Sequence, residues 1–165
     1  VPVLRLTDGQ VLEESLDIMY WALERNDPQQ WLIPLEGTLP EMQALIAQND
    51  GPFKHHLDRY KYVTRHEEGA DPIDHRAEGA RLLNTLNDRL ENSPQLFGDR
   101  PTLADYAIIP FVRQFANTDR AWFDTQPFRE LQQWLDSHLN SEIFLAIMKK
   151  WPVWAPGDQE PIFPV

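Results

Sequence analysis

The chain has 165 residues, of which 42% are hydrophobic and 25% charged, and its net charge is −11 at pH 7. That charge repels phosphate backbones and anionic lipids, which excludes nucleic acid and membrane surfaces as expected partners, and no apolar run reaches the roughly 20 residues that span a bilayer. Because the sequence contains no cysteine, disulfides and thiolate metal sites are excluded within it.

We expect a short hairpin at the start of the chain. Apolar residues fill most of 3–6 and all of 11–12, and Asp8 and Gly9 between them favour a tight turn with positive φ at both central positions. The apolar residues of 3–6 fall on both strand faces, which is typical of a strand buried in a larger sheet. A lone hairpin is marginally stable in water, so the pattern predicts further strands around it.

The next segment is predicted to be a helix over residues 15–26. Ser15 suits the N-cap position, where unpaired N–H groups and the positive end of the helix dipole face outward. These groups form a seat for an anion, and the acidic Glu14 stands beside it. A ligand that carries a carboxylate and an ammonium on one carbon, as an α-amino acid does, fits this arrangement.

An ordered linker over 28–37 and a block of helices are predicted to follow. Apolar residues at helical spacing predict a helix from Thr38 to a break at 50–52, and further helices over 53–66, 72–90, 102–115, 126–139 and 141–150. Thr102 and Asp105 form a capping box that we interpret as structural, because a buried helix start needs partners for its N–H groups. The predicted fold class is α/β, mainly helical.

Two stretches carry a resemblance to a known family. They are Val1-Pro2-Val3-Leu4 with Asp8-Gly9-x-Val11-Leu12-x-Glu14-Ser15-Leu16-x-Ile18, and Arg100-Pro101-Thr102-Leu103-Ala104-Asp105-Tyr106-Ala107. In this order they resemble the glutathione-binding half-site and the helical-domain capping motif of the glutathione transferase superfamily. The resemblance implies that 1–27 is the C-terminal half of a thioredoxin-like domain, 28–37 the linker, and 38–165 an all-α domain with a Pro-rich tail.

The resemblance also implies a glutathione site. The bond before Pro2 is expected to be cis, and the backbone of Val1 to clasp the cysteinyl part of glutathione. Ser15 and the neighbouring N–H groups are expected to hold the γ-glutamyl carboxylate, and Glu14 the ammonium. The family begins with a strand, a helix and a strand that carry a reactive Ser, Tyr or Cys, so we expect the catalytic residue upstream of Val1 and no turnover by this segment alone.

An electrophile pocket is expected to border the glutathione site. Its candidates are Phe53, His56 and Tyr60, with Trp151 or Trp154 of the tail, and the alternative for each is plain packing between helices. Four histidines at 55, 56, 66 and 75 raise the possibility of a metal site. Adjacent histidines on a helix point about 100° apart, and none has the i, i+4 spacing of a helical zinc motif, so we predict a solvated surface and no metal.

The predicted function is that of a cytoplasmic, homodimeric glutathione transferase-like protein. Glutathione is the expected co-substrate and a small electrophile the second substrate, which the full-length form would conjugate or reduce. A non-catalytic glutathione-binding, regulatory or scaffold protein of the same fold is the alternative, because fold does not dictate function. A third possibility is a helical module that folds alone. The residue near the end of the expected upstream strand would distinguish an enzyme from a binding protein.

Overall fold

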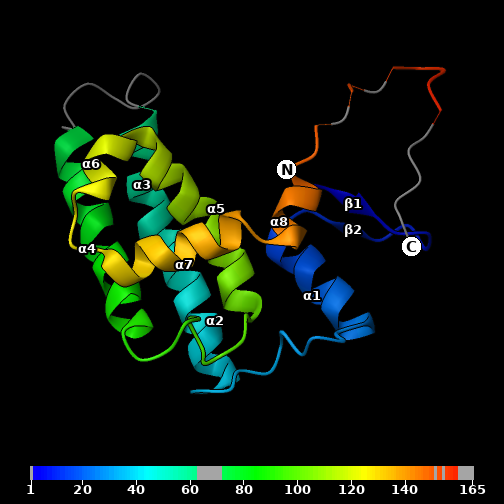
Figure 1. Cartoon of the computed structure of the whole chain (residues 1–165). Helices are drawn as coiled ribbons and strands as arrows, with labels where there is room; N and C mark the ends of the chain where they lie inside the picture. Colours follow the sequence, from blue (N-terminus) through cyan, green and yellow to red (C-terminus); the bar gives the residue numbers. More distant parts are fainter. Residues whose placement is uncertain (1, 63–71, 151, 154, 160–165) are drawn as a thin grey trace.

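The computed structural model describes residues 2–62, 72–150, 152–153 and 155–159. It confirms the predicted fold class, because a two-stranded hairpin and one helix lead through a linker into an all-α block (Figure 1). The helices are α1 (Ser15–Arg25), α2 (Leu39–Gln48), the π-turn η1 (Asn49–Phe53), α3 (Lys54–Lys61), α4 (Pro72–Leu90), α5 (Leu103–Thr118), α6 (Arg120–Asp124), α7 (Arg129–Leu139) and α8 (Glu142–Ile147). No helix among the described residues has both the length and the apolar character needed to cross a membrane.

The hairpin pairs β1 (Leu4–Arg5) with β2 (Val11–Leu12) in antiparallel register, with Leu4 opposite Leu12. The loop differs from the predicted tight turn, because only Gly9, with φ of 93°, has a positive φ there. The Gly9 N–H donates to the Leu6 carbonyl (3.1 Å), and the Asp8 carboxylate accepts from the Gln10 N–H (2.9 Å). This is the longer hairpin loop in which a single glycine takes the left-handed position.

The predicted break at residues 50–52 is absent, which is the second difference from expectation. Helix α2 continues through the π-turn η1 into α3, and the backbone stays in the right-handed helical region at Gln48, Asn49, Phe53 and Lys54. Pro52 has no N–H to donate and would disrupt a regular α-helix, whereas one wider turn accommodates it without ending the helix.

The core lies inside the helical block and is built around α5, which packs between α2, α3 and α7. Gly79 of α4 faces Phe115 of α5, and a Cβ at position 79 would lie only 2.4 Å from Cε2 of that ring. The Phe115 ring also stacks against Phe53 and Tyr60, with ring centroids 5.6 and 5.0 Å apart. Glycine at 79 therefore sets how closely the two helices approach.

The carboxylate of Asp105, which is 0% exposed, joins three segments of this core. One oxygen accepts the N–H and the hydroxyl of Thr102 at 2.8 and 2.9 Å, which caps α5. The other accepts the Leu96 N–H at 3.0 Å and the Trp134 indole N–H at 2.9 Å. The loop before α5, the start of α5 and the middle of α7 therefore share one anchor.

The linker between α1 and α2 is held in place by hydrogen bonds. The Trp31 carbonyl accepts the Leu103 N–H at the start of α5 (2.9 Å), and the Asp27 carboxylate accepts the Trp31 N–H (2.8 Å). The Arg100 guanidinium donates to the linker carbonyls of Gln29 (2.6 Å), Gln30 (2.6 Å) and Ile33 (3.1 Å). These bonds position α1 against the helical block.

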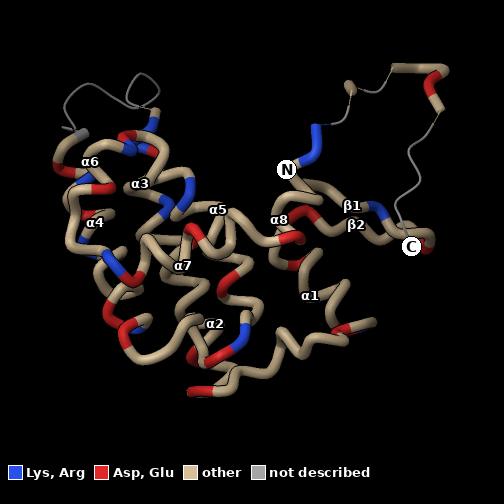
Figure 2. Tube along the Cα trace, viewed as in Figure 1, with Lys and Arg blue, Asp and Glu red and all other residues tan. Residues whose placement is uncertain are grey.

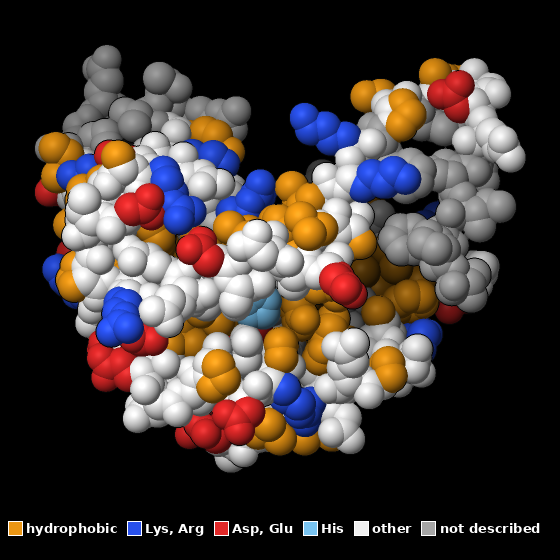
Figure 3. Space-filling model, viewed as in Figure 1, with side chains coloured by type: hydrophobic (Ala, Val, Ile, Leu, Met, Phe, Trp, Pro, Cys, Tyr) orange, Lys and Arg blue, Asp and Glu red, His pale blue; other side chains and the backbone are white. Residues whose placement is uncertain are grey.

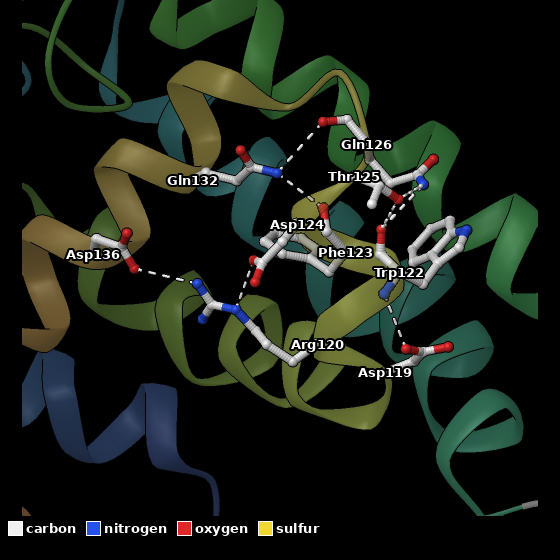
Figure 4. A network of polar contacts seen from close by, with 9 residues as sticks. All are labelled: Asp119, Arg120, Trp122, Phe123, Asp124, Thr125, Gln126, Gln132 and Asp136. Carbon is white, nitrogen blue, oxygen red and sulfur yellow. Dashed lines mark hydrogen bonds and ion pairs between the residues drawn. The ribbon is translucent and has the colours of Figure 1, made fainter.

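The short helix α6 was not predicted from the sequence. Polar contacts of its side chains and backbone explain why five residues are enough to form it (Figure 4). Asp119 caps it by accepting the Trp122 N–H at 3.0 Å. Arg120 donates to Asp124 at 2.7 Å and also faces Asp136 of α7 at 3.6 Å. Gln132 of α7 donates to the Phe123 carbonyl at 2.9 Å, so α6 is fastened to α7.

Replacing Asp105 with alanine should leave three or more buried donors without a partner. We expect the free energy of unfolding to fall by at least about 3 kcal/mol, since each buried orphaned group costs about 1–3 kcal/mol. Asp105→Asn should lose less, because its amide oxygen can still accept from Leu96 and Trp134. Urea denaturation would measure both, with the exposed Asp88→Ala as the control; a loss below about 1 kcal/mol for Asp105→Ala would contradict the anchor role.

Candidate functional site at the start of α1

The first turn of α1 presents backbone N–H groups to solvent. The helix begins at Ser15, and Glu14, with φ of −106° and ψ of 141°, occupies the N-cap position without a side-chain cap bond. Ser15 is therefore the first helical residue and not the N-cap, one position from expectation. The first internal bond runs from the Ile18 N–H to the Glu14 carbonyl (3.1 Å), so the preceding N–H groups and the exposed Ser15 hydroxyl are oriented for an anion.

A second carboxyl, on η1, interacts with Glu14. Partial burial raises the pKa of the Asp50 carboxyl, and the negative charge of Glu14 raises it further, while Asn49 and Lys54 lower it. Burial is the largest of these influences on the Asp50 carboxyl and the charge of Glu14 the smallest. Asp50 and Glu14 are far apart in the sequence, so no local pattern could have identified this pair.

An apolar cavity of about 250 Å³ lies between α1, the linker, α5, α7 and α8. Figure 3 shows apolar side chains gathered where α8 meets the helical block. The cavity is lined by Met19, Trp31, Tyr106, Ile109, Pro110, His138, Ser141, Ile143, Phe144 and Ile147. Met19 stands four residues after Ser15 and so on the same face of α1, which places the anion seat and the cavity on one side of that helix.

Two polar side chains in the lining have shifted proton affinities. Burial, followed by the charge of Asp105, raises the pKa of the Tyr106 phenol, so it stays protonated and can donate a hydrogen bond. Burial lowers the pKa of His138, against the opposing effect of Asp105. The His138 Nε2 lies 2.7 Å from the Gln95 amide oxygen, to which it donates. Tyr106 also stacks on Trp31, with centroids 4.0 Å apart.

The predicted pocket residues lie elsewhere. Phe53 and Tyr60 are 3% and 8% exposed and pack on Phe115 in the core, so neither lines the cavity, and this placement favours their packing interpretation. His56 lies half-buried beside His75. Val1, Trp151 and Trp154 fall outside the described residues, and Pro2 is exposed.

Sequence reasoning missed most of the cavity. Tyr106 could have been found, because it directly follows the capping motif at Thr102 and Asp105. His138 lies in a segment rich in polar residues and carried no signal, whereas the helix of α8 was predicted but not its place in the cavity wall. Glu14 and Ser15 lie at the start of α1, and the cavity that borders this helix is completed by Trp31 of the linker and by α5, α7 and α8.

Comparison with known proteins agrees with this architecture. The chain is similar to the bacterial glutathione transferase BphK, solved as a ternary complex, with 21% identity, a TM-score of 0.71, and coverage of 88% of this chain and 71% of BphK. It is similar to a class Gtt2 glutathione transferase of Vibrio parahaemolyticus, with 16% identity, a TM-score of 0.72, and coverage of 87% and 70%.

A glutathione transferase from Burkholderia graminis, solved with two glutathione molecules per subunit, is 24% identical, with a TM-score of 0.69 and coverage of 86% of this chain and 62% of that one. No functionally curated protein matches the chain. The family model described as "Glutathione S-transferase, C-terminal domain" matches residues 29–137, which is more than half of the chain. The chain therefore belongs to the glutathione S-transferase family, by its C-terminal domain.

Proposed function

We propose that this chain is part of a cytoplasmic, homodimeric protein that binds glutathione and conjugates or reduces small electrophiles with it. The observation that supports this most directly is the start of α1, where the Ser15 hydroxyl and the first backbone N–H groups of the helix suit a carboxylate. The apolar cavity lies farther along the same face of this helix. Solved relatives of the same fold hold glutathione, among them the Burkholderia graminis protein.

In this proposal, the γ-glutamyl end of glutathione binds at the start of α1. The Ser15 hydroxyl and the backbone N–H groups donate to its carboxylate, and each charge-assisted bond contributes about 1.5–3 kcal/mol. Glu14 accepts from its ammonium. The backbone of Val1, outside the described residues, would clasp the cysteinyl part next to Pro2.

The cavity would receive the apolar part of the electrophile. Its lining is mostly hydrophobic, and such surface favours a ligand whose burial removes apolar area from water. The Tyr106 phenol, which stays protonated, would orient the ligand by donating a hydrogen bond. The group that activates the glutathione thiol is expected ahead of Val1, where a nearby hydroxyl or a helix N-terminus would lower the thiol pKa.

A binding protein without turnover is the second candidate. The same fold can serve this role, because fold does not dictate function. An activity assay with glutathione and a chlorinated nitroaromatic acceptor distinguishes the enzyme from the binding protein. The assay uses the protein together with any residues that precede Val1. Binding without turnover would support the second candidate, and turnover the first.

Replacing Ser15 with alanine should raise the dissociation constant for glutathione about tenfold, which corresponds to about 1.4 kcal/mol. The variant removes one donor to the carboxylate and leaves the helix N–H groups in place. Isothermal titration calorimetry on the same full-length protein would measure it. Ser137→Ala is the matched control, because that exposed serine lies on α7; equal affinities for Ser15→Ala and wild type would refute the assignment.

Filling the cavity should block apolar ligands and spare glutathione. Ile143 lines the cavity and is 39% exposed, so Ile143→Trp can add bulk there without unfolding the core. We expect about tenfold weaker binding of 1-anilinonaphthalene-8-sulfonate, on the order of 1.4 kcal/mol, by fluorescence titration. Leu145→Trp is the control on the same helix, since Leu145 is 60% exposed and not part of the lining. Equal loss in both variants would place the dye elsewhere.

A further inference from the structure

Three imidazoles from two helices meet on the surface of the helical block. His55 and His56 come from α3 and His75 from the first turns of α4, and one ring nitrogen of each lies within 4.8 Å of the other two. We propose that His55, His56 and His75 bind one divalent transition-metal ion, with Zn²⁺ as the best match. This departs from the expectation of no metal and is independent of the glutathione site.

The pairing of two helices explains why sequence spacing did not reveal the site. His55 and His56 are adjacent on α3, with ring centroids 5.1 Å apart, and α4 packs directly against α3. The His75 ring lies 5.1 Å from the His56 ring and 6.0 Å from the His55 ring, measured between centroids. One residue of α4 thus faces both histidines of α3, which the i, i+4 rule for a single helix does not describe.

The distances suit a small ion after modest side-chain rotation. Zinc–nitrogen bonds of about 2.0–2.1 Å in a tetrahedral site place ligand nitrogens about 3.3 Å apart. The Nδ1 atoms of His56 and His75 are 2.9 Å apart, slightly closer than that. His55 is exposed, so its ring has space to turn toward the other two.

Arg59 is the group that a metal would have to displace or bypass. Its guanidinium donates to the Nδ1 of His55 at 3.0 Å and to the His55 carbonyl at 3.3 Å. If the metal binds through Nδ1 of His55, the hydrogen bond from Arg59 to that nitrogen is lost. The hydrogen bond from Arg59 to the His55 carbonyl can remain. Glu78, about one turn beyond His75, acts electrostatically on His56 and is paired with Arg81 at 3.0 Å.

The donor set selects the class of ion. Neutral imidazole nitrogens suit Zn²⁺ and its transition-metal neighbours, whereas Mg²⁺ and Ca²⁺ prefer oxygen. Three nitrogens leave a fourth tetrahedral position for water. An ion bound here would join α3 to α4, on either side of residues 62–71. It would stabilise the folded chain by an amount that grows with the logarithm of the free-ion concentration above the dissociation constant.

Calorimetric titration of the chelator-treated full chain with Zn²⁺ tests the proposal. We expect one ion per chain, and at least tenfold weaker binding for each of His55→Asn, His56→Asn and His75→Asn. His55 is exposed, so its variant keeps the test valid if replacement of a half-buried histidine disturbs folding, which circular dichroism would report. Asp88→Asn, an exposed position farther along α4, controls for nonspecific attraction to acidic residues, whose positions along the chain are red in Figure 2.

Zinc should also raise the melting temperature of the wild type and of Asp88→Asn, and leave that of the histidine variants unchanged. A tenfold excess of Mg²⁺ should not displace it. Equal zinc affinity in the wild type and the three histidine variants would overturn the site, and so would displacement by Mg²⁺, which would indicate carboxylate ligands.

Discussion

The buried carboxylate of Asp105 is the interaction on which the helical block depends most. Removing a charge from water is costly unless hydrogen bonds satisfy it, and here the donors come from Leu96, Thr102 and Trp134. The loop before α5, the start of α5 and α7 must therefore be in place together. The same charge acts on Tyr106 and His138 in the cavity wall, so the anchor of the fold also sets the electrostatics of the proposed ligand site.

The linker connects α1 to the helical block and is itself fixed by hydrogen bonds and stacking. Trp31 accepts a hydrogen bond from the first residue of α5 and stacks on Tyr106, while Arg100 fixes the carbonyls around it. The cavity consequently has one wall from α1 and the others from the helical block, without a loose hinge between them. A ligand held at the start of α1 and a ligand in the cavity would share this frame.

Local chemistry explains which features could be predicted. The Asp8-Gly9 turn, the cap at Thr102 and the apolar period of α4 are short-range signals, and the structure has a hairpin or a helix at each. Pro52 misled the prediction, because a π-turn absorbs it. The cavity and the histidine cluster depend on segments that are distant in sequence, such as Met19 with Ile147 and His56 with His75, and no periodicity in one sequence reports such contacts.

The contact between Gly79 and Phe115 has an evolutionary consequence. A methyl group at 79 would collide with a ring that Phe53 and Tyr60 already hold in place, so the ring has nowhere to go in a close-packed interior. A side chain at 79 therefore requires a compensating change elsewhere in the core. A descendant of this chain with alanine at 79 needs a smaller side chain at 115, or a wider separation of α4 and α5 that would also move His75, one turn away, relative to α3.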